Sequence, residues 1–171
     1  FVIFKLQEID GRFPVASDTE ALKIILRDYQ PLFSETGYLL LQHAPRGQGR
    51  VPEGKTLLTR QIKIGELIDI HTWNQQPLLL NLDIRKSWLG HLMSFFYRLP
   101  VVYLDLGTTD GGHQSYRILP TMTPSSFMIN PLILRQSDLI DWYTGNSLKK
   151  LETFKVSVTP EWLQSFFQTD I

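Results

Sequence analysis

Two aspartates and a histidine are the residues of this sequence best suited to acid–base chemistry. Asp83 and Asp105 are expected on the polar faces of two adjacent strands, and His113 follows the turn after the second strand. Glycoside hydrolysis uses two carboxyl groups across a sugar-sized gap, and a histidine can act as a further general acid or base. Polar strand faces also carry ordinary solvated aspartates, and we favour this interpretation. A small hydrolase or glycan-modifying enzyme using a carboxylate/His site is the alternative function.

Metal-binding patterns are weak in this sequence. It contains no cysteine and four histidines, at His43, His71, His91 and His113. No two of these histidines have the spacing of a shared site on one helix or strand. Asp69 and His71 stand two residues apart on a predicted strand, and such a pair is common by chance. We therefore expect no metal site.

Motifs for nucleophilic catalysis and phosphate binding are absent from the sequence. There is no G-x-S-x-G elbow, and Ser125 and Ser126 follow Pro124 in a predicted loop, where they would act as turn residues. The stretch from Gly107 to Gly112 matches neither a P-loop nor a dinucleotide fingerprint. We expect neither a catalytic residue nor a cofactor here.

Aromatic residues form local clusters, which suit either a core or a ligand surface. The clustered residues are Phe95, Phe96, Tyr97, Trp142, Tyr143, Trp162, Phe166 and Phe167. Such residues can bind sugars or lie against a lipid interface, because Trp and Tyr combine an apolar body with a polar tip. We expect Phe95 and Phe96 in the core. Trp142 and Tyr143 suit the core and ligand contact equally.

Arg98 and Arg117 lie near the proline-bounded ends of predicted strands. A guanidinium group there can bind exposed backbone carbonyls or a carboxylate, and Asp83 or Asp105 would be a natural partner. We favour this structural role over contact with an anion or a sugar. If the domain binds a ligand, the candidate residues are Trp142, Tyr143, Arg98, Arg117, Asp83, Asp105 and His113.

The elements that position these candidates are mostly strands. From Leu78 to Ile84, apolar and polar residues alternate, which places one face on a core. Residues 101–106 show the same pattern, and the turn residues at 108–112 favour a hairpin with a return strand at 114–119. Weaker strands are predicted over Tyr38–Gln42, Thr56–Ile64, Glu66–Ile70, Phe127–Ile129 and Phe154–Val158.

Short helices and one loop complete the predicted elements. Helical spacing is found over Asp18–Tyr29, Trp88–Tyr97, Gln136–Trp142 and Pro160–Phe167. Ser17, Asp18 and Thr19 are candidate caps of the first helix, and Ala44–Gly54 is predicted to be an exposed loop. The fold class is mainly β: an antiparallel β-sandwich or jelly-roll-like body with short helical decorations. An open α+β sheet is the alternative.

Length and composition narrow the classes of function. The 171 residues suit one domain, and 43% of them are apolar, which is enough for a core without disulfides. Seventeen basic residues balance seventeen acidic ones, so we expect no nucleic-acid partner. No apolar run is long enough for a membrane span. Because the chain begins at Phe1 and not at methionine, we expect a piece of a longer protein.

The segment 78–132 combines several further features. They are an LDI strand, a helix ending in FFYR-x-P, a VYL strand, a DG turn, YR-x-LP and an S-x-F-x-x-x-PL run. This segment resembles the extracytoplasmic part of uncharacterised bacterial polytopic membrane proteins, some of which are glycosyltransferase-like in their membrane part. The resemblance implies a non-catalytic periplasmic domain, tethered through its flanks. It would contact a glycan, a lipid-linked saccharide or the membrane-embedded remainder of its own chain.

Overall fold

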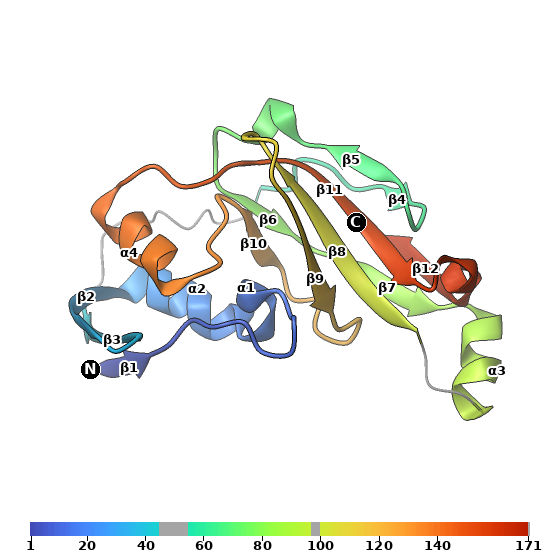
Figure 1. The fold of residues 1–171 in the computed structure, drawn as a ribbon, viewed down its shortest axis with the longest axis horizontal. Helices are drawn as coiled ribbons and strands as arrows, with labels where there is room; N and C mark the ends of the chain where they lie inside the picture. Colours follow the sequence, from blue (N-terminus) through green and yellow to red (C-terminus); the bar gives the residue numbers. More distant parts are fainter. Residues whose placement is uncertain (45–54, 97–99, 171) are drawn as a thin grey trace.

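The computed structural model describes residues 1–44, 55–96 and 100–170, and within them the protein is mainly β (Figure 1). The central sheet has the order β5–β11–β8–β9, made of Leu67–Asp69, Leu151–Thr159, Val101–Thr108 and His113–Ile118. The sheet β1–β3–β2 is made of Val2–Phe4, Tyr38–His43 and Tyr29–Glu35. The sheet β4–β12–β7 is made of Gln61–Ile62, Phe167–Asp170 and Asp83–Lys86. The pair β10–β6 is made of Phe127–Asn130 and Leu78–Leu80.

Short helices connect the strands of these sheets. The α-helices are α1 (Pro14–Ser17), α2 (Thr19–Asp28), α3 (Trp88–Phe96) and α4 (Gln136–Thr144). Two 3₁₀ turns, η1 and η2, span His71–Trp73 and Glu161–Phe166. In the described part of the chain, no helix is both long and apolar enough to span a bilayer.

The central hairpin confirms the strongest prediction from the sequence. β8 and β9 pair antiparallel from Val102 opposite Ile118 to Gly107 opposite His113. Gly111 adopts a positive φ of 79° in the turn between them, a conformation that glycine adopts without a Cβ clash. The inward side chains of β8, at 102, 104 and 106, are buried. Strand alternation therefore sets which face of the hairpin is wet.

The core lies between layers of strands. In Figure 1, β6 and β7 pass behind β8, β9 and β11. Buried side chains from these layers and from the helices belong to one hydrophobic cluster. Every strand ladder is antiparallel within the described residues, so the mainly β, sandwich-like prediction is confirmed.

The segment 78–84 is divided between two sheets, although the sequence predicts a single strand. Its alternate residues 78, 80, 82 and 84 are buried as expected. At Leu82, however, the backbone N–H donates to the carbonyl of Thr123 (3.1 Å), and the Asn81 amide donates to the carbonyl of Pro124 (2.9 Å). A loop thus takes the place of a partner strand, and the chain leaves the β10 pairing for the β12 pairing.

Several other elements differ from the prediction. Strands β1, β2 and β12 were not predicted, and only residues 61–62 of the expected strand 56–64 are extended. Tyr29 begins β2 and does not end α2. The expected cap of α2 is missing, because the Thr19 hydroxyl donates backwards to the carbonyl of Val15 (3.0 Å) and Asp18 makes no cap bond. Residues 161–166 form a 3₁₀ turn. The expected loop at 45–54 and helix residue Tyr97 lie outside the described residues.

Candidate ligand pocket

A pocket of about 570 Å³ opens beside the start of β11. We call it the amide pocket, because side-chain amides dominate its polar lining. Its lining residues are Asn74, Gln75, Gln76, Pro77, Asn130, Pro131, Trp142, Gly145, Asn146, Ser147, Leu148 and Lys150. The volume lies within the range of about 300–1,000 Å³ that is usual for small-molecule sites.

Asn130 holds one wall of the amide pocket in place. Its side-chain amide donates to the backbone carbonyls of Asn74 (3.0 Å) and Gln76 (2.8 Å). Its carbonyl oxygen accepts a hydrogen bond from the backbone N–H of Leu151 (2.9 Å). The Asn130 side chain is buried, so these bonds are shielded from water. One residue thereby joins β10, the loop after η1 and the start of β11.

The end of helix α4 supplies another part of the pocket wall. The Asp138 carboxylate accepts the backbone N–H groups of Leu134 (2.8 Å) and Arg135 (2.9 Å), which fixes the start of the helix. At the other end Gly145 adopts a left-handed conformation, φ 79°, and its N–H donates to the carbonyl of Asp141 (2.9 Å). Trp142, in the last turn, is buried and lines the pocket. An aromatic side chain therefore forms part of the pocket wall.

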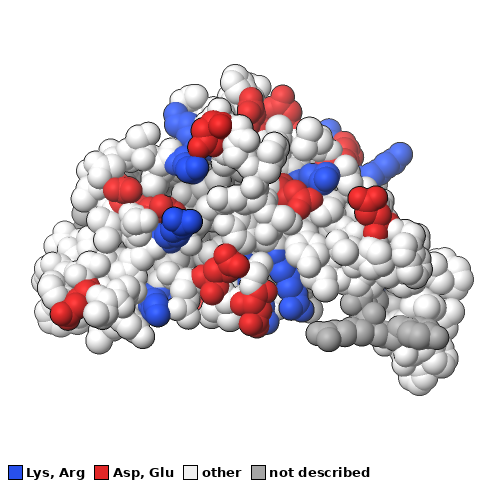
Figure 2. Space-filling view, in the orientation of Figure 1, with Lys and Arg blue, Asp and Glu red and all other residues white. Residues whose placement is uncertain are grey.

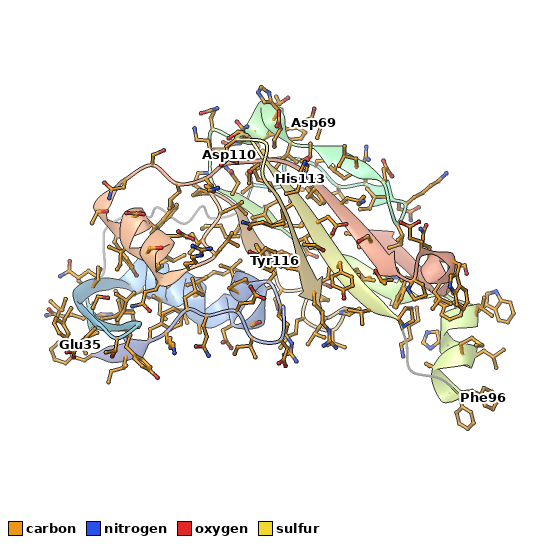
Figure 3. The ribbon with its side chains drawn as sticks, in the orientation of Figure 1. Glu35, Asp69, Phe96, Asp110, His113 and Tyr116 are labelled. Atoms are coloured by element: carbon orange, nitrogen blue, oxygen red, sulfur yellow. The ribbon has the colours of Figure 1, made fainter. Side chains whose placement is uncertain are left out.

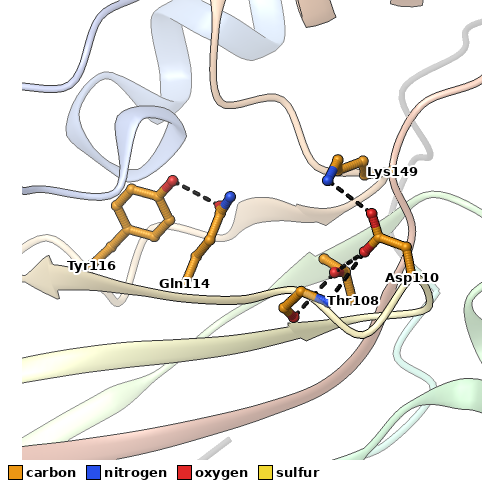
Figure 4. Close-up of polar contacts among 6 residues, drawn as sticks. Thr108, Asp110, Gln114, Tyr116 and Lys149 are labelled. Carbon is orange, nitrogen blue, oxygen red and sulfur yellow. Dashed lines mark hydrogen bonds and ion pairs between the residues drawn. The ribbon is translucent and has the colours of Figure 1, made fainter.

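A lysine closes one side of the amide pocket. The Lys150 ammonium donates to the side-chain carbonyl of Gln75 (2.6 Å), whose amide in turn donates to the Asn74 side chain (2.9 Å). The neighbouring Lys149 points elsewhere and pairs with Asp110 (2.8 Å) in the β8–β9 turn (Figure 4). Among the described residues that line the pocket, Lys150 is the one with a positively charged side chain, and none is an aspartate or a glutamate.

Asp110 serves the β8–β9 turn and not the pocket. Its carboxylate accepts hydrogen bonds from the Lys149 ammonium, the Thr108 hydroxyl and the backbone N–H of Gly112 (Figure 4). These bonds, the lysine bond foremost, hold the pKa of the Asp110 carboxyl well below its usual value, because they stabilise the charged form. Nearby on β9, burial raises the pKa of Tyr116, whose hydroxyl donates to Gln114 (2.9 Å).

Three of the predicted site residues share the outer face of the central sheet. Asp105 on β8 lies opposite Ser115 on β9. His113 and Arg117 lie two residues before and two residues after Ser115, so their side chains point to the same face of the sheet. The Asp105 carboxylate accepts the Ser115 hydroxyl (2.6 Å) and approaches the Lys155 ammonium of β11 (3.6 Å). This face is open and lies apart from the residues that line the amide pocket. Asp105 is therefore part of a cross-strand polar ladder.

Asp83 is not a neighbour of Asp105, which corrects the prediction. It lies on β7, in a different sheet from β8, and its carboxylate pairs with Arg85 on the same strand. Among the described residues, Asp83 forms an ion pair with Arg85, and Asp105 forms one with Lys155. Arg98 lies outside the described residues. The two carboxylates thus belong to separate ion pairs on strands of different sheets.

The other polar candidates have structural contacts. The Asp69 carboxylate accepts the backbone N–H of His71 (2.8 Å) and so supports the start of η1, which leaves the two residues on different elements. The Ser126 hydroxyl lies 3.5 Å from the Asn81 amide. No group of three or more His, Asp or Glu side chains suited to a metal occurs among the residues that the structure describes.

The structure corrects the prediction for Phe95 and Phe96 and places Tyr143, which suited the core and ligand contact equally, in the core. Phe95 and Phe96 were expected in the core, but their exposed fractions are 84% and 68%. Tyr143 is buried and its hydroxyl donates to the carbonyl of Ile25 (2.8 Å), so it ties α4 to α2. Of the predicted ligand residues in the described chain, Trp142 alone lines the amide pocket.

Sequence reasoning missed the amide residues of the pocket. The run Asn74-Gln75-Gln76 before Pro77 and the Asn130-Pro131 pair were visible signals, since amides beside proline favour exposed turns that can present polar groups. Their convergence is a tertiary effect. Comparisons with protein-family models, with curated proteins and with solved structures found no match for this chain.

Proposed function

We propose that this chain is the extracytoplasmic domain of a bacterial membrane protein and that it binds a saccharide in the amide pocket without catalysing a reaction. The observation that carries the proposal is the lining of that pocket. It combines side-chain amides, Ser147, a lysine and the buried Trp142. The resemblance of residues 78–132 to the extracytoplasmic part of polytopic membrane proteins supports the location.

The chemistry of the lining fits a sugar. Each sugar hydroxyl both donates and accepts hydrogen bonds, and an Asn or Gln side chain offers both functions in one plane. Apolar surface from Trp142, Pro77 and Leu148 can pack against the C–H groups of a sugar ring. Lys150 adds a positive charge suited to the phosphate that joins a saccharide to a lipid carrier. The ligand class is therefore a glycan or a lipid-linked saccharide.

Binding without catalysis fits better than hydrolysis. Asp83, Asp105 and His113, the residues of the hydrolase alternative, are absent from the lining of the amide pocket. Glycoside hydrolysis requires carboxyl groups on both sides of the scissile bond. The described lining supplies amides in their place, which bind hydroxyl groups but do not transfer protons at neutral pH.

A bacterial glycan array, followed by calorimetric titration of the best-bound saccharide, tests the proposal. We expect the double variant Gln76→Ala/Ser147→Ala to weaken binding about threefold to tenfold for each polar contact removed. Both side chains line the pocket, and both residues are exposed, so the fold should tolerate the changes. The matched control, Gln61→Ala/Ser165→Ala, removes the same groups from exposed sites outside the pocket.

The two variants separate pocket binding from surface binding. Weakening by the pocket variant together with unchanged binding by the control supports the proposal. Absence of binding across the array, or equal effects of both variants, contradicts it. Release of a shortened saccharide during incubation would instead revive the hydrolase alternative.

A further inference from the structure

Helix α3 carries a large apolar surface that the described chain leaves uncovered. Trp88, Leu92, Phe95 and Phe96 have exposed fractions of 77%, 51%, 84% and 68%. Phe96 lies at the tip of α3, and the helix projects from the body (Figures 1 and 3). Four large apolar side chains so exposed on one short helix exceed the scattered exposure that is normal on protein surfaces.

The apolar face of α3 points away from the body of the protein. At about 100° per residue, the four exposed side chains occupy a sector of about 100° on one face. The opposite face carries Gly90, which is buried against η2. The polar face of a surface helix usually points to water, whereas here the exposed face is mainly apolar, with the exposed His91 at its edge. A helix that contacted only water on this side would be expected to carry polar residues there.

The helix is held in this orientation by its N-terminal turn. The Ser87 hydroxyl donates to the carbonyl of Ser165 (2.7 Å), and the Ser87 N–H donates to the carbonyl of Phe166 (2.9 Å). Gly90 lies so close to the Phe166 carbonyl that an added Cβ would collide with it. The four exposed apolar side chains of the helix form the α3 patch: Trp88, Leu92, Phe95 and Phe96.

Charge is excluded from this part of the surface. In the space-filling view, the lobe formed by α3 shows neither red nor blue, whereas both colours are scattered over the rest of that face (Figure 2). The residues of α3 include no acidic and no Lys or Arg side chain. Two cations precede the helix: Arg85, which pairs with Asp83, and the exposed Lys86. An apolar helix without acidic, lysine or arginine residues, beside an exposed lysine, matches an interface between hydrocarbon and anionic head groups.

We propose that the α3 patch inserts into the interfacial layer of a lipid bilayer and holds this domain against the membrane surface. A projecting helix can be surrounded by fluid lipid on all of its exposed sides, whereas a protein partner would need a matching groove. Trp88 suits the head-group level because indole combines an apolar ring with an N–H donor. Membrane contact by the folded body is not required for saccharide binding, so this inference goes beyond the proposed function.

Flotation of the 171-residue chain with vesicles of phosphatidylethanolamine and phosphatidylglycerol tests this proposal. We expect the protein to float with the vesicles and its tryptophan emission to shift to the blue. The double variant Phe95→Ser/Phe96→Ser should lower the vesicle partition coefficient by about tenfold for each ring, because each loses most of its apolar transfer energy. Both residues are exposed, so the variant should fold as the parent does.

The matched control is Ile3→Ser/Phe33→Ser. These side chains, 73% and 56% exposed, lie on the sheet β1–β3–β2, away from α3. Flotation that the α3 variant abolishes and the control leaves intact supports the proposal. Failure of the parent chain to float, or equal flotation of parent and α3 variant, overturns it. Concentration-dependent sedimentation that only the α3 variant removes would also overturn it, because the patch would then join two protein chains.

Discussion

Replacing Asn130 with alanine tests how the amide pocket is built. Loss of the side chain leaves the buried N–H of Leu151 without its acceptor, a change that costs about 1–3 kcal/mol. The two bonds donated to the Asn74 and Gln76 carbonyls add about 0.5–1.5 kcal/mol each. The free energy of unfolding should therefore fall by about 2–6 kcal/mol, measured by urea denaturation at neutral pH.

The isosteric change Asn130→Asp should make the stability of the pocket wall depend on pH. The new carboxyl keeps an acceptor towards Leu151, but its second oxygen faces two backbone carbonyls where the amide donated. Only the protonated form can donate there, so folding should raise the pKa of this carboxyl above its usual value of about 3.9. A raised folded pKa means that the stabilising contribution is present at low pH and is lost as the pH rises through it.

We therefore expect Asn130→Asp to approach the parent in stability near about pH 4 and to fall well below it near about pH 7. Urea denaturation of both proteins across this range gives the difference directly. Two results would refute the hydrogen-bonding account of the pocket wall. One is a difference in the free energy of unfolding between the parent and Asn130→Asp that does not change with pH. The other is a decrease in that free energy of less than about 1 kcal/mol for Asn130→Ala.

Two further predictions concern the attachment of α3 and the β8–β9 turn. Gly90→Ala should lower the free energy of unfolding by about 1–3 kcal/mol, because the added methyl group collides with the Phe166 carbonyl; denaturation curves that coincide with the parent would contradict this. Asp110→Asn should destabilise the parent fold at neutral pH but not at strongly acidic pH. The lowered pKa of Asp110 means that its contribution is present above the unfolded value and is lost as the pH falls through the folded one. An NMR titration in which the Asp110 carboxyl titrates normally, or an unchanged titration in Lys149→Met, would contradict the assigned cause.

Local patterns determined much of the β architecture. Alternation at 78–84 and 101–106, with turn residues at 108–112, correctly predicted which residues are buried and where the chain reverses. These features depend on neighbours a few residues apart, because side chains alternate across a strand and glycine permits the turn. The spacing of apolar residues also predicted α3, because a helical apolar stripe has the same spacing in the sequence whether it faces the core or the solvent.

Tertiary contacts decided the rest. Periodicity cannot tell a stripe that faces a core from one that faces outwards, so the exposure of Phe95 and Phe96 depended on how Gly90 seats the helix on η2. Strand partners are likewise chosen by distant segments, as when the Thr123 carbonyl diverts the chain at Leu82 and separates Asp83 from Asp105. The amide pocket exists only because Asn130 joins segments far apart in the sequence. Residue types were visible in the sequence, but their convergence required the folded chain.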